Sequence, residues 1–514
     1  MDTDIWRQTL GDLLRRTAAR YPHKEAVRCG SVVWTYAQFD QLCTRLAAGL
    51  SHHEIRAGDH VAVLARNSHA FAAMRFALAR LGAVLVPINF MLQAHEVAYI
   101  LRHAGVRVLC VDSESAALGR DAAALDTPVR QFIWLPDEEA GEPVAGLLTF
   151  DDLLSIGANR QLPPAQITSQ SLAQIVYTSG TESQPKGAML THEAVLAEYV
   201  SCLFDAEISA SDVTLHALPL YHCAQLDVFF GPGVYVGSSN IITAKPTAEN
   251  LLPLIERHGI TSFFAPPTVW ISLLRSPLFE RHDLSRLRKG YYGASIMPVE
   301  VLKEIQHRLP QLRLWNLYGQ TELGLATGLK PEDQVRKAGS AGLPTLNVET
   351  RVVDENGQPV APGEIGEIVH RSPHLMRGYY RDEERTQAAF EGGWFHSGDL
   401  ATIDEEGYIT VVDRKKDMIK TGGENVSSRE VEEVIYRLGE VSEVAVIGLA
   451  DARWIEAVTA VIALKSGCTL SEAAVIEHCR ARLAGFKTPK RVIFVSSLPD
   501  RKSTRLNSSH PYRS

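Results

Sequence analysis

Short apolar runs alternate with amphipathic helical patterns over residues 9–112 of the 514-residue chain. Apolar residues at helical spacing predict helices over residues 10–21, 36–50 and 70–81, and short apolar runs predict strands over residues 32–36, 60–64, 83–87 and 106–111. Alternation at this spacing is typical of βαβ units, which build a parallel sheet covered by helices on both faces. Because such sheets bind ligands at the carboxyl ends of their strands, functional loops are expected at that edge.

A mostly apolar, strand-like run over residues 172–176 ends in a loop rich in hydroxyls and glycine. The loop reads Tyr177-Thr178-Ser179-Gly180-Thr181-Glu182-Ser183-Gln184-Pro185-Lys186-Gly187. A buried strand that runs into such a loop presents backbone N–H groups and hydroxyls to an anion, and Lys186 adds a mobile positive charge. The loop is therefore predicted to hold a triphosphate.

Three other interpretations of this loop were weighed. A nucleoside-triphosphatase P-loop needs glycine before its lysine, but Pro185 stands there and no Ser or Thr follows Lys186. The serine hydrolase pattern of penicillin-binding proteins and β-lactamases matches in order at Ser183-x-x-Lys186, Ser238-x-Asn240 and Lys420-Thr421-Gly422. That serine should open a helix, whereas Ser183 lies inside a loop and no secretory signal precedes it. A plain surface loop is the remaining alternative.

Size and composition narrow the class of protein further. The chain is too long for one core, so at least two domains are expected. A net charge of −8 gives no basic surface for nucleic acid, and no apolar run is long enough to span a bilayer. Seven cysteines are scattered without a C-x-x-C pair, which favours reduced thiols and a cytoplasmic location.

The loop resembles the phosphate-binding signature of the adenylate-forming superfamily, which includes acyl-CoA synthetases, luciferases and peptide-synthetase adenylation domains. It departs from the signature at Glu182 and Ser183, where the family usually has Thr-Gly. Loss of that glycine restricts the backbone, and a carboxylate near phosphates repels them unless it points outward. The residues that the resemblance assigns to the nucleotide are Thr178, Ser179, Gly180, Thr181, Lys186 and Gly187.

Two further strand ends follow in the family's order. Residues 218–222, Leu-Pro-Leu-Tyr-His, lead into the acyl pocket in the family, which would place His222 beside the substrate carboxylate. A histidine with a purely structural role is the alternative. Gly293 and Ala294 are small enough for an adenine ring to lie against the backbone, although a strand end also carries glycine simply to turn.

The run Asn316-Leu317-Tyr318-Gly319-Gln320-Thr321-Glu322 resembles the family's Tyr-Gly-x-Thr-Glu motif without a mismatch. The resemblance implies that Tyr318 and Gly319 contact adenine and that Thr321 donates its hydroxyl to the α-phosphate. Glu322 would supply a hard oxygen ligand for Mg²⁺. A magnesium ion held by one carboxylate and by phosphates needs no dense cluster of metal ligands.

The third set of motifs follows residue 393. Asp399, in the run Trp394-Phe395-His396-Ser397-Gly398-Asp399, is expected to accept hydrogen bonds from both ribose hydroxyls. The charged run 413–420 would usually be a solvated face, but here it resembles the family's hinge, with Arg414 beside the ribose and Lys416 as the pivot. Gly422 and Gly423 would let the pantetheine arm of coenzyme A approach closely.

The resemblance ends abruptly after Pro499. The family normally continues with a Gly-Lys pair whose lysine contacts the carboxylate and α-phosphate during adenylation. Here Arg505 occupies that spacing without the glycine, and Lys502 lies three positions early. Residues 501–514 are polar, basic and aperiodic, so a disordered tail is expected. Their amino-acid sequence looks like translated adapter sequence joined to a truncated gene.

Taken together, the resemblance implies an α/β fold with a large N-terminal domain of parallel-rich sheets flanked by helices and a small mobile α+β C-terminal domain. The predicted ranges are 1–415 for the first domain, 416–500 for the second, expected to be truncated, and 501–514 for the tail. The implied enzyme is an AMP-forming acid–CoA ligase that uses ATP, Mg²⁺ and coenzyme A.

A medium- or long-chain fatty acid is the expected substrate of that ligase. An aryl or other organic acid, and a truncated nucleotide-binding relative with impaired adenylation, are kept as alternatives. A peptide-synthetase module is disfavoured because no carrier domain is attached. Neither a nucleic-acid partner nor an integral membrane segment is expected, and a homodimer is left open.

Overall fold

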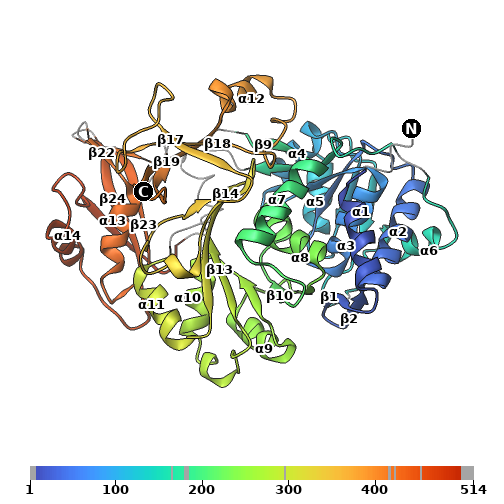
Figure 1. Cartoon of the computed structure of the whole chain (residues 1–514), viewed down its shortest axis with the longest axis horizontal. Helices are drawn as coiled ribbons and strands as arrows, with labels where there is room; N and C mark the ends of the chain where they lie inside the picture. Colours follow the sequence, from blue (N-terminus) through green and yellow to red (C-terminus); the bar gives the residue numbers. More distant parts are fainter. Residues whose placement is uncertain are drawn as a thin grey trace. The chain divides into compact units, whose positions relative to one another are not determined.

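The computed structural model describes residues 7–139, 141–163, 166–178, 184–293, 297–414, 418–421, 424–451 and 454–498 (Figure 1). The chain divides into two compact units. The first comprises Met1–Gly180, Gln184–Glu349 and Arg371–Glu391, and the second comprises Thr181–Ser183, Thr350–His370 and Gly392–Ser514. The predicted ranges 1–415, 416–500 and 501–514 stay predictions.

A seven-stranded sheet of the first unit has the strand order β7-β6-β5-β3-β4-β8-β9. Its strands are β3 (His60–Leu64), β4 (Val84–Pro87), β5 (Val108–Val111), β6 (Gln131–Trp134), β7 (Leu148–Thr149), β8 (Leu172–Thr178) and β9 (Lys186–Thr191). All pairs from β7 to β8 are parallel, and β9 closes the edge antiparallel to β8. The expected parallel sheet is confirmed, and its last two strands flank the predicted phosphate loop.

A nine-stranded sheet completes the first unit, in the order β16-β15-β14-β13-β12-β10-β11-β1-β2. Its strands are β1 (Glu25–Cys29), β2 (Val32–Thr35), β10 (Val213–His216), β11 (Ser239–Ile242), β12 (Ser262–Phe264), β13 (Lys289–Gly293), β14 (Arg313–Gln320), β15 (Gly324–Leu329) and β16 (Leu343–Pro344). The pairs from β1 through β11, β10, β12 and β13 to β14 are parallel. The sheet therefore presents the carboxyl ends of these strands along one edge.

Helices of the first unit begin where the sequence supplies caps. Thr35, Ser68 and Thr191 each accept a hydrogen bond from a first-turn backbone N–H group, which satisfies a donor that the helix itself leaves unpaired. The helices are α1 (Leu10–Arg20), α2 (Tyr36–His52), α3 (His69–Leu81), α4 (Ala94–His103), α5 (Ala116–Ala123), α6 (Phe150–Gly157), α7 (His192–Asp205), α8 (Gly231–Val236), α9 (Ala248–His258), α10 (Pro267–Arg275), α11 (Val299–Arg308) and α12 (Glu383–Ala389). Residues Ala224–Phe230 form a π-helix, η2. Short 3₁₀ turns are η3 (Phe279–Arg281), η4 (Pro331–Asp333) and η5 (Glu391–Gly393).

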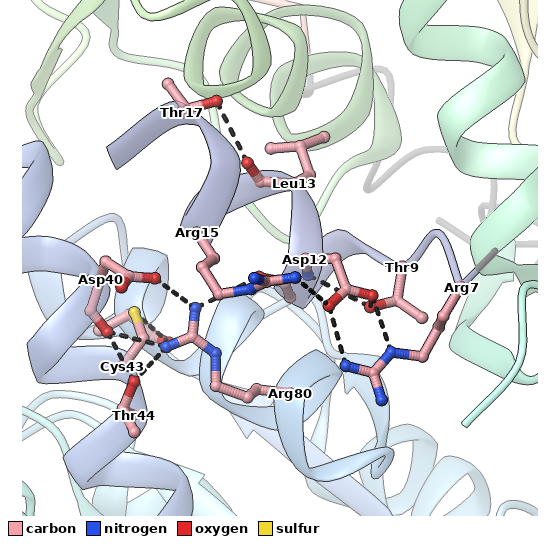
Figure 2. A network of polar contacts seen from close by, with 12 residues as sticks. Arg7, Thr9, Asp12, Leu13, Arg15, Thr17, Asp40, Cys43, Thr44 and Arg80 are labelled. Carbon is pink, nitrogen blue, oxygen red and sulfur yellow. Dashed lines mark hydrogen bonds and ion pairs between the residues drawn. The ribbon is translucent and has the colours of Figure 1, made fainter. Parts of the chain in front are cut away.

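Polar contacts tie the first three helices together (Figure 2). Arg7 makes a bidentate pair with Asp12, with both N–O distances at 3.0 Å, beside the N-cap Thr9 of α1. Arg80 at the end of α3 donates to the Asp40 carboxylate of α2 at 2.5 Å and to the Gly11 carbonyl at 3.2 Å (Figure 2). Since a forked guanidinium holds several acceptors in fixed directions, Arg80 sets how α1, α2 and α3 pack.

The second unit contains two antiparallel-rich sheets. The first has the order β17-β18-β19-β20, with β17 (Glu349–Val353), β18 (Gly366–Arg371), β19 (Phe395–Ile403) and β20 (Ile409–Arg414). The second has β22-β21-β24-β23 with β25 added to β24, from β21 (Ile419–Thr421), β22 (Glu424–Val426), β23 (Val441–Asp451), β24 (Ile455–Leu464) and β25 (Arg491–Val495). Helices α13 (Ser428–Tyr436) and α14 (Glu472–Arg480) contribute buried side chains to its core. The predicted small α+β arrangement is confirmed.

Within the described part of the chain, no helix combines the length and the apolar character that a bilayer crossing requires.

Candidate functional site

The predicted phosphate loop connects the antiparallel strands β8 and β9. Thr178 lies opposite Lys186 in this pair, and Tyr177 lies opposite Gly187. A Cβ atom at Gly187 would come within 2.8 Å of the Ile175 side chain and 3.0 Å of the Tyr177 ring, which explains the glycine. The hairpin therefore delivers Thr178 and Lys186 to one place. The loop residues Ser179, Gly180 and Thr181 lie outside the described residues.

Lys186 and Glu322 meet around one tyrosine, Tyr379. The Lys186 ammonium lies 5.3 Å from the centre of the Tyr379 ring, within the range of a cation–π contact. The Tyr379 hydroxyl donates to Glu322 Oε1 at 2.9 Å. Burial first, and then the Glu322 charge, raises the pKa of Tyr379, so the phenol keeps its proton and stays a donor. A cation, a phenol and a carboxylate from three distant segments are thus assembled in the first unit.

Tyr379 arrives here because its segment extends the hairpin by backbone pairing. Tyr379 forms an antiparallel bridge with Ala188, and the Tyr380 N–H donates to the Gly187 carbonyl at 2.8 Å. The Met376 N–H donates to the Glu322 carbonyl at 2.7 Å. Sequence reasoning missed Tyr379. The signal that could have found it is the Gly378-Tyr379-Tyr380 run, a glycine followed by two aromatic residues that can line a site.

The turn between β14 and β15 carries the motif from Tyr318 to Glu322. Gly319 pairs with Leu325, and a Cβ atom at Gly319 would lie 1.9 Å from the Gly324 carbonyl oxygen, so only glycine fits. The register shifts between Tyr318 and Gly319, which marks an irregularity of the ladder at the motif itself. Gln320 Nε2 donates to the Tyr318 hydroxyl at 3.4 Å. The turn is therefore held tightly on both strands.

His222 lies two residues before η2, and the Cys223 side chain lies between it and Thr321. The Cys223 thiol is 3.9 Å from His222 Nδ1 and 3.7 Å from Thr321 Oγ1. The approach to His222 is fixed by Asn67, whose amide donates to the Leu218 carbonyl at 2.7 Å. The structure thus brings the predicted residues His222 and Thr321 to neighbouring positions of one site, and the roles assigned to them stay predictions.

Gly293 ends β13 and pairs with Leu317 of β14. A Cβ atom there would lie 2.3 Å from the Leu317 carbonyl oxygen, so the close approach of two strands already requires glycine. Gly293 therefore has a structural role, which the sequence analysis gave as the alternative to contact with adenine. The next predicted residue, Ala294, lies outside the described residues.

Tyr177, at the start of the phosphate loop, is held in place by aromatic residues of α4. Its hydroxyl is 2.7 Å from Nδ1 of His103, and the two rings meet edge to face. Tyr99 stacks on His103 from α4, with ring centroids 5.4 Å apart. Burial lowers the pKa of His103, which favours the neutral imidazole as the partner of Tyr177. The loop therefore starts from a fixed aromatic support.

Beyond η2 the interior is filled by aromatic side chains. Phe229 of η2 stacks on Phe264 at 4.5 Å between ring centroids, and Tyr291 stacks on Trp315 at 5.1 Å. All four belong to one buried cluster with Val228 and Leu317. The core next to η2 is therefore filled by stacked aromatic rings rather than by flexible aliphatic side chains.

The remaining predicted ribose residues belong to the second unit. Asp399 of β19 is buried and faces Arg414 of β20 in the antiparallel register. Gly398 has φ of +71° inside β19, where the register with β18 shifts, and its N–H donates to Glu367 Oε1 at 3.1 Å. Lys416, Gly422 and Gly423 lie outside the described residues, as does the side chain of Arg414. Convergence of Asp399 with Lys186 and Glu322 around one nucleotide stays a prediction.

The fold is a two-unit α/β architecture that groups Lys186, Tyr379 and Glu322 at the hairpin of β8 and β9. The AMP-binding enzyme family profile matches residues 14–380, and the profile of the AMP-binding enzyme C-terminal domain matches residues 430–505. The chain belongs to the AMP-binding enzyme family, within the adenylate-forming superfamily and its acyl-CoA synthetase group.

Relatives in this group span aryl and alkyl acids. A feruloyl-CoA synthase from Amycolatopsis sp is 35% identical over 97% of each chain. A long-chain-fatty-acid–CoA ligase from Mycobacterium tuberculosis is 34% identical, over 96% of this chain and 95% of the relative. Among solved structures, the anthranilate CoA ligase AuaEII in complex with anthranoyl-AMP superposes with a TM-score of 0.88 at 27% identity, covering 97% of this chain and 95% of that one.

Proposed function

We propose that the protein is an ATP-dependent acid–CoA ligase that activates a carboxylic acid as an acyl-adenylate and then transfers the acyl group to coenzyme A. The observation that carries the proposal is the assembly of Lys186, Tyr379 and Glu322 beside Thr178, at the strand hairpin that borders the phosphate loop. Membership of the AMP-binding enzyme family supports it. Cytoplasmic location is a further expectation of the same proposal, and a homodimer is left open.

In the first half-reaction a carboxylate oxygen of the acid attacks the α-phosphorus of ATP, and the bond to pyrophosphate breaks. Lys186 neutralises charge on the phosphate oxygens, and Thr321 donates a hydrogen bond to the α-phosphate. Glu322 offers a hard oxygen ligand that fits Mg²⁺, which when bound would neutralise further phosphate charge. Tyr379 orients that carboxylate through its 2.9 Å hydrogen bond. Positioning and charge neutralisation are sufficient for this chemistry, so no side-chain nucleophile is needed.

In the second half-reaction the thiol of coenzyme A attacks the acyl carbonyl carbon, and the bond to AMP breaks. His222 would lie beside the acyl carboxylate and Asp399 would hold the ribose. The exchange of adenylation for thioester formation is assigned to rotation of the small domain about Lys416, with Gly422 and Gly423 admitting the pantetheine arm. These assignments extend the family's motifs residue by residue.

For the acid, two candidates are retained because different observations favour them. A medium- or long-chain fatty acid is the expectation from the sequence resemblance. An aryl acid is the second candidate, which the likeness to a feruloyl-CoA synthase supports, as the likeness to a long-chain-fatty-acid–CoA ligase supports the first.

The proposal includes a selective weakness in the adenylation half-reaction. Arg505 stands where the family has the lysine of its Gly-Lys pair, and Thr504 stands in place of the glycine. These positions lie outside the described residues. Slow adenylation with largely retained thioester formation from supplied acyl-adenylate is therefore proposed, and a relative that only binds nucleotide is the extreme of this alternative.

The test is ATP–pyrophosphate exchange over acetate, hexanoate, palmitate and benzoate, followed by coenzyme A consumption with the best acid. Exchange that depends on an acid, and that falls at least 100-fold in Lys186→Ala, supports the proposal. Selective exchange with palmitate favours the fatty-acid candidate, and selective exchange with benzoate favours the aryl candidate. Absence of exchange, of acyl transfer from supplied acyl-adenylate and of ATP binding would refute the function, and acylation of Ser183 by a penicillin probe would favour the hydrolase interpretation.

A further inference from the structure

A buried ion pair and its neighbours lie outside the residues that the reaction uses. Arg75 of α3 donates to Asp227 Oδ1 at 2.9 Å, with side chains 1% and 0% exposed. Gln174 of β8 donates to Asp227 Oδ2 at 2.7 Å, and the Tyr199 hydroxyl of α7 donates to Oδ1 at 3.2 Å. With Glu198 of α7, these residues form what we call the Asp227 cluster. One carboxylate thus gathers donors from three other elements.

Two elements that the Asp227 cluster joins, β8 and η2, lead to residues of the candidate site. Gln174 lies on β8, the strand that ends at Thr178. Asp227 lies in η2, whose first turn is tied to His222, because the Gln225 and Leu226 N–H groups both donate to the His222 carbonyl at 3.1 and 3.0 Å. The cluster therefore links β8 and η2 through buried hydrogen bonds.

The third element is the turn that carries Thr321 and Glu322. Glu198 is buried, and a Cβ atom at Gly324 would lie 2.1 Å from Glu198 Oε1. Gly324 has φ of +73°, a conformation that favours glycine. The Glu198 carboxyl thus packs directly against the backbone that follows Glu322.

Arg75 supplies the positive charge of the Asp227 cluster, beside the two carboxyl groups of Asp227 and Glu198. The ionisable groups that interact with Glu198 are Asp227 of η2, Arg75 of α3, Tyr199 and Cys202 of α7, and Cys223 before η2. Burial, and then the Asp227 charge, raises the pKa of Glu198 well above its ordinary value. Burial also raises the pKa of both thiols and of the phenol, which favours their neutral forms beside the Arg75–Asp227 ion pair.

Stability alone does not account for this arrangement. Among the described residues, Arg75 Nε, Arg75 Nη1, Gln174 Oε1 and Glu198 Oε1 are buried and have no hydrogen-bond partner. A buried ion pair is often matched or surpassed in stability by apolar side chains of similar volume, and unpaired polar atoms add a cost. Moreover, η2 is a π-helix, a form that occurs frequently at functional sites. A cluster that costs stability beneath three site elements indicates a role in their geometry.

We propose that Asp227 and Glu198 are positioning residues of the ligase reaction: Asp227 fixes β8 and η2 relative to each other, and Glu198 fixes the turn that carries Thr321 and Glu322. This inference rests on the proposed function. It assigns no contact with substrate to either residue, and it makes the adenylation rate depend on side chains that act through Thr178, His222 and Glu322.

The test compares four variants by pyrophosphate exchange at a temperature well below unfolding, with the folded fraction checked by circular dichroism. Asp227→Asn should lower kcat at least tenfold, because the Arg75 charge loses its partner and the grip on η2 loosens. Glu198→Ala should lower kcat similarly, whereas Glu198→Gln, which mimics the neutral carboxyl, should keep kcat within threefold. The control is Asp212→Asn, which breaks the buried Asp212–Lys289 pair of 2.8 Å and should lower thermal stability while leaving kcat unchanged.

A double variant, Arg75→Met with Asp227→Leu, removes both charges and guards against a fold that fails because of one unpaired charge. It should fold and still show at least tenfold lower kcat, since the hydrogen bonds from Gln174 and Tyr199 are lost. Wild-type kcat in the folded double variant, or equal losses in Glu198→Gln and Glu198→Ala, would overturn the inference.

A wild-type chain without exchange on any acid would count against the proposed function alone. The positioning role of the Asp227 cluster is then tested by the rise in Tm that MgATP produces in the wild type and in each variant. That rise should be kept in Glu198→Gln and at least halved in Asp227→Asn, and an unchanged rise in Asp227→Asn would refute the positioning role.

Discussion

Removal of one hydroxyl, in Tyr379→Phe, tests how the candidate site is organised. The lost contact is the 2.9 Å hydrogen bond to Glu322 Oε1, and Tyr379 itself is 8% exposed. A hydrogen bond to a charged group contributes about 1.5–3 kcal/mol. Since about 1.4 kcal/mol corresponds to a tenfold change in rate, kcat/KM for MgATP should fall roughly 10- to 150-fold. The assay is ATP–pyrophosphate exchange with a saturating acid, at several Mg²⁺ concentrations.

The neighbouring residue supplies the matched control. Tyr380→Phe removes a hydroxyl from a ring that packs edge to face against His60 and His103, and it leaves the Glu322 contact intact. Its kcat/KM should stay within about threefold of the wild type, because a change that removes no hydrogen bond has little effect. If Tyr379→Phe and Tyr380→Phe have the same kcat/KM, Tyr379 does not orient Glu322 and the proposed grouping around Lys186 loses its support.

Three further outcomes follow from other parts of the structure. Gly319→Ala places a Cβ atom 1.9 Å from a carbonyl oxygen and should lower the free energy of unfolding by at least about 2 kcal/mol. Gly328→Ala is the control, because its Cβ atom would have its nearest neighbour at 3.4 Å and should not lower that free energy. Equal urea midpoints for the two variants would contradict this prediction. Burial lowers the pKa of His216 to about 4, below its unfolded value of about 6.5, so the unfolded chain binds the additional proton and stability falls as pH drops from 6.5 towards 4. His216→Gln should show a shallower loss of urea midpoint between pH 7 and 5, and an unchanged slope would refute it. Replacement of Thr504-Arg505 by Gly-Lys should accelerate pyrophosphate exchange while thioester formation from supplied acyl-adenylate stays constant, and identical exchange rates would disprove the selective defect.

The sequence predicted strands and helices well where the pattern within one segment is sufficient to specify the element. The apolar runs at residues 60–64 and 83–87 correspond to β3 and β4, since buried parallel strands need little beyond continuous apolar character. The loop after β8 was predicted for the same reason, because a strand end followed by hydroxyls and glycine is a local signal. Lys186 and Glu322 both contact Tyr379, whereas their predicted convergence with Asp399 around one nucleotide stays a prediction.

Contacts between distant segments escaped prediction. Tyr379 reaches Lys186 only because residues 376–380 pair with the backbone of β9 and of Glu322, and backbone pairing leaves no trace in side-chain identity. No local pattern marks Asp227, since its partner Arg75 is 152 positions away. The π-helical form of η2 has no simple periodic signature in the sequence, so a helix was not expected there.

The buried pair of Arg75 and Asp227 also has an evolutionary consequence. Either residue alone would leave an uncompensated charge in the interior, so a lineage that exchanges one must exchange the other almost at once or pass through a poorly folded intermediate. Among homologues the two positions should accordingly be inherited as a unit, present together or replaced together by apolar residues. Their joint presence would mark a subgroup by descent, independently of which acid its members activate.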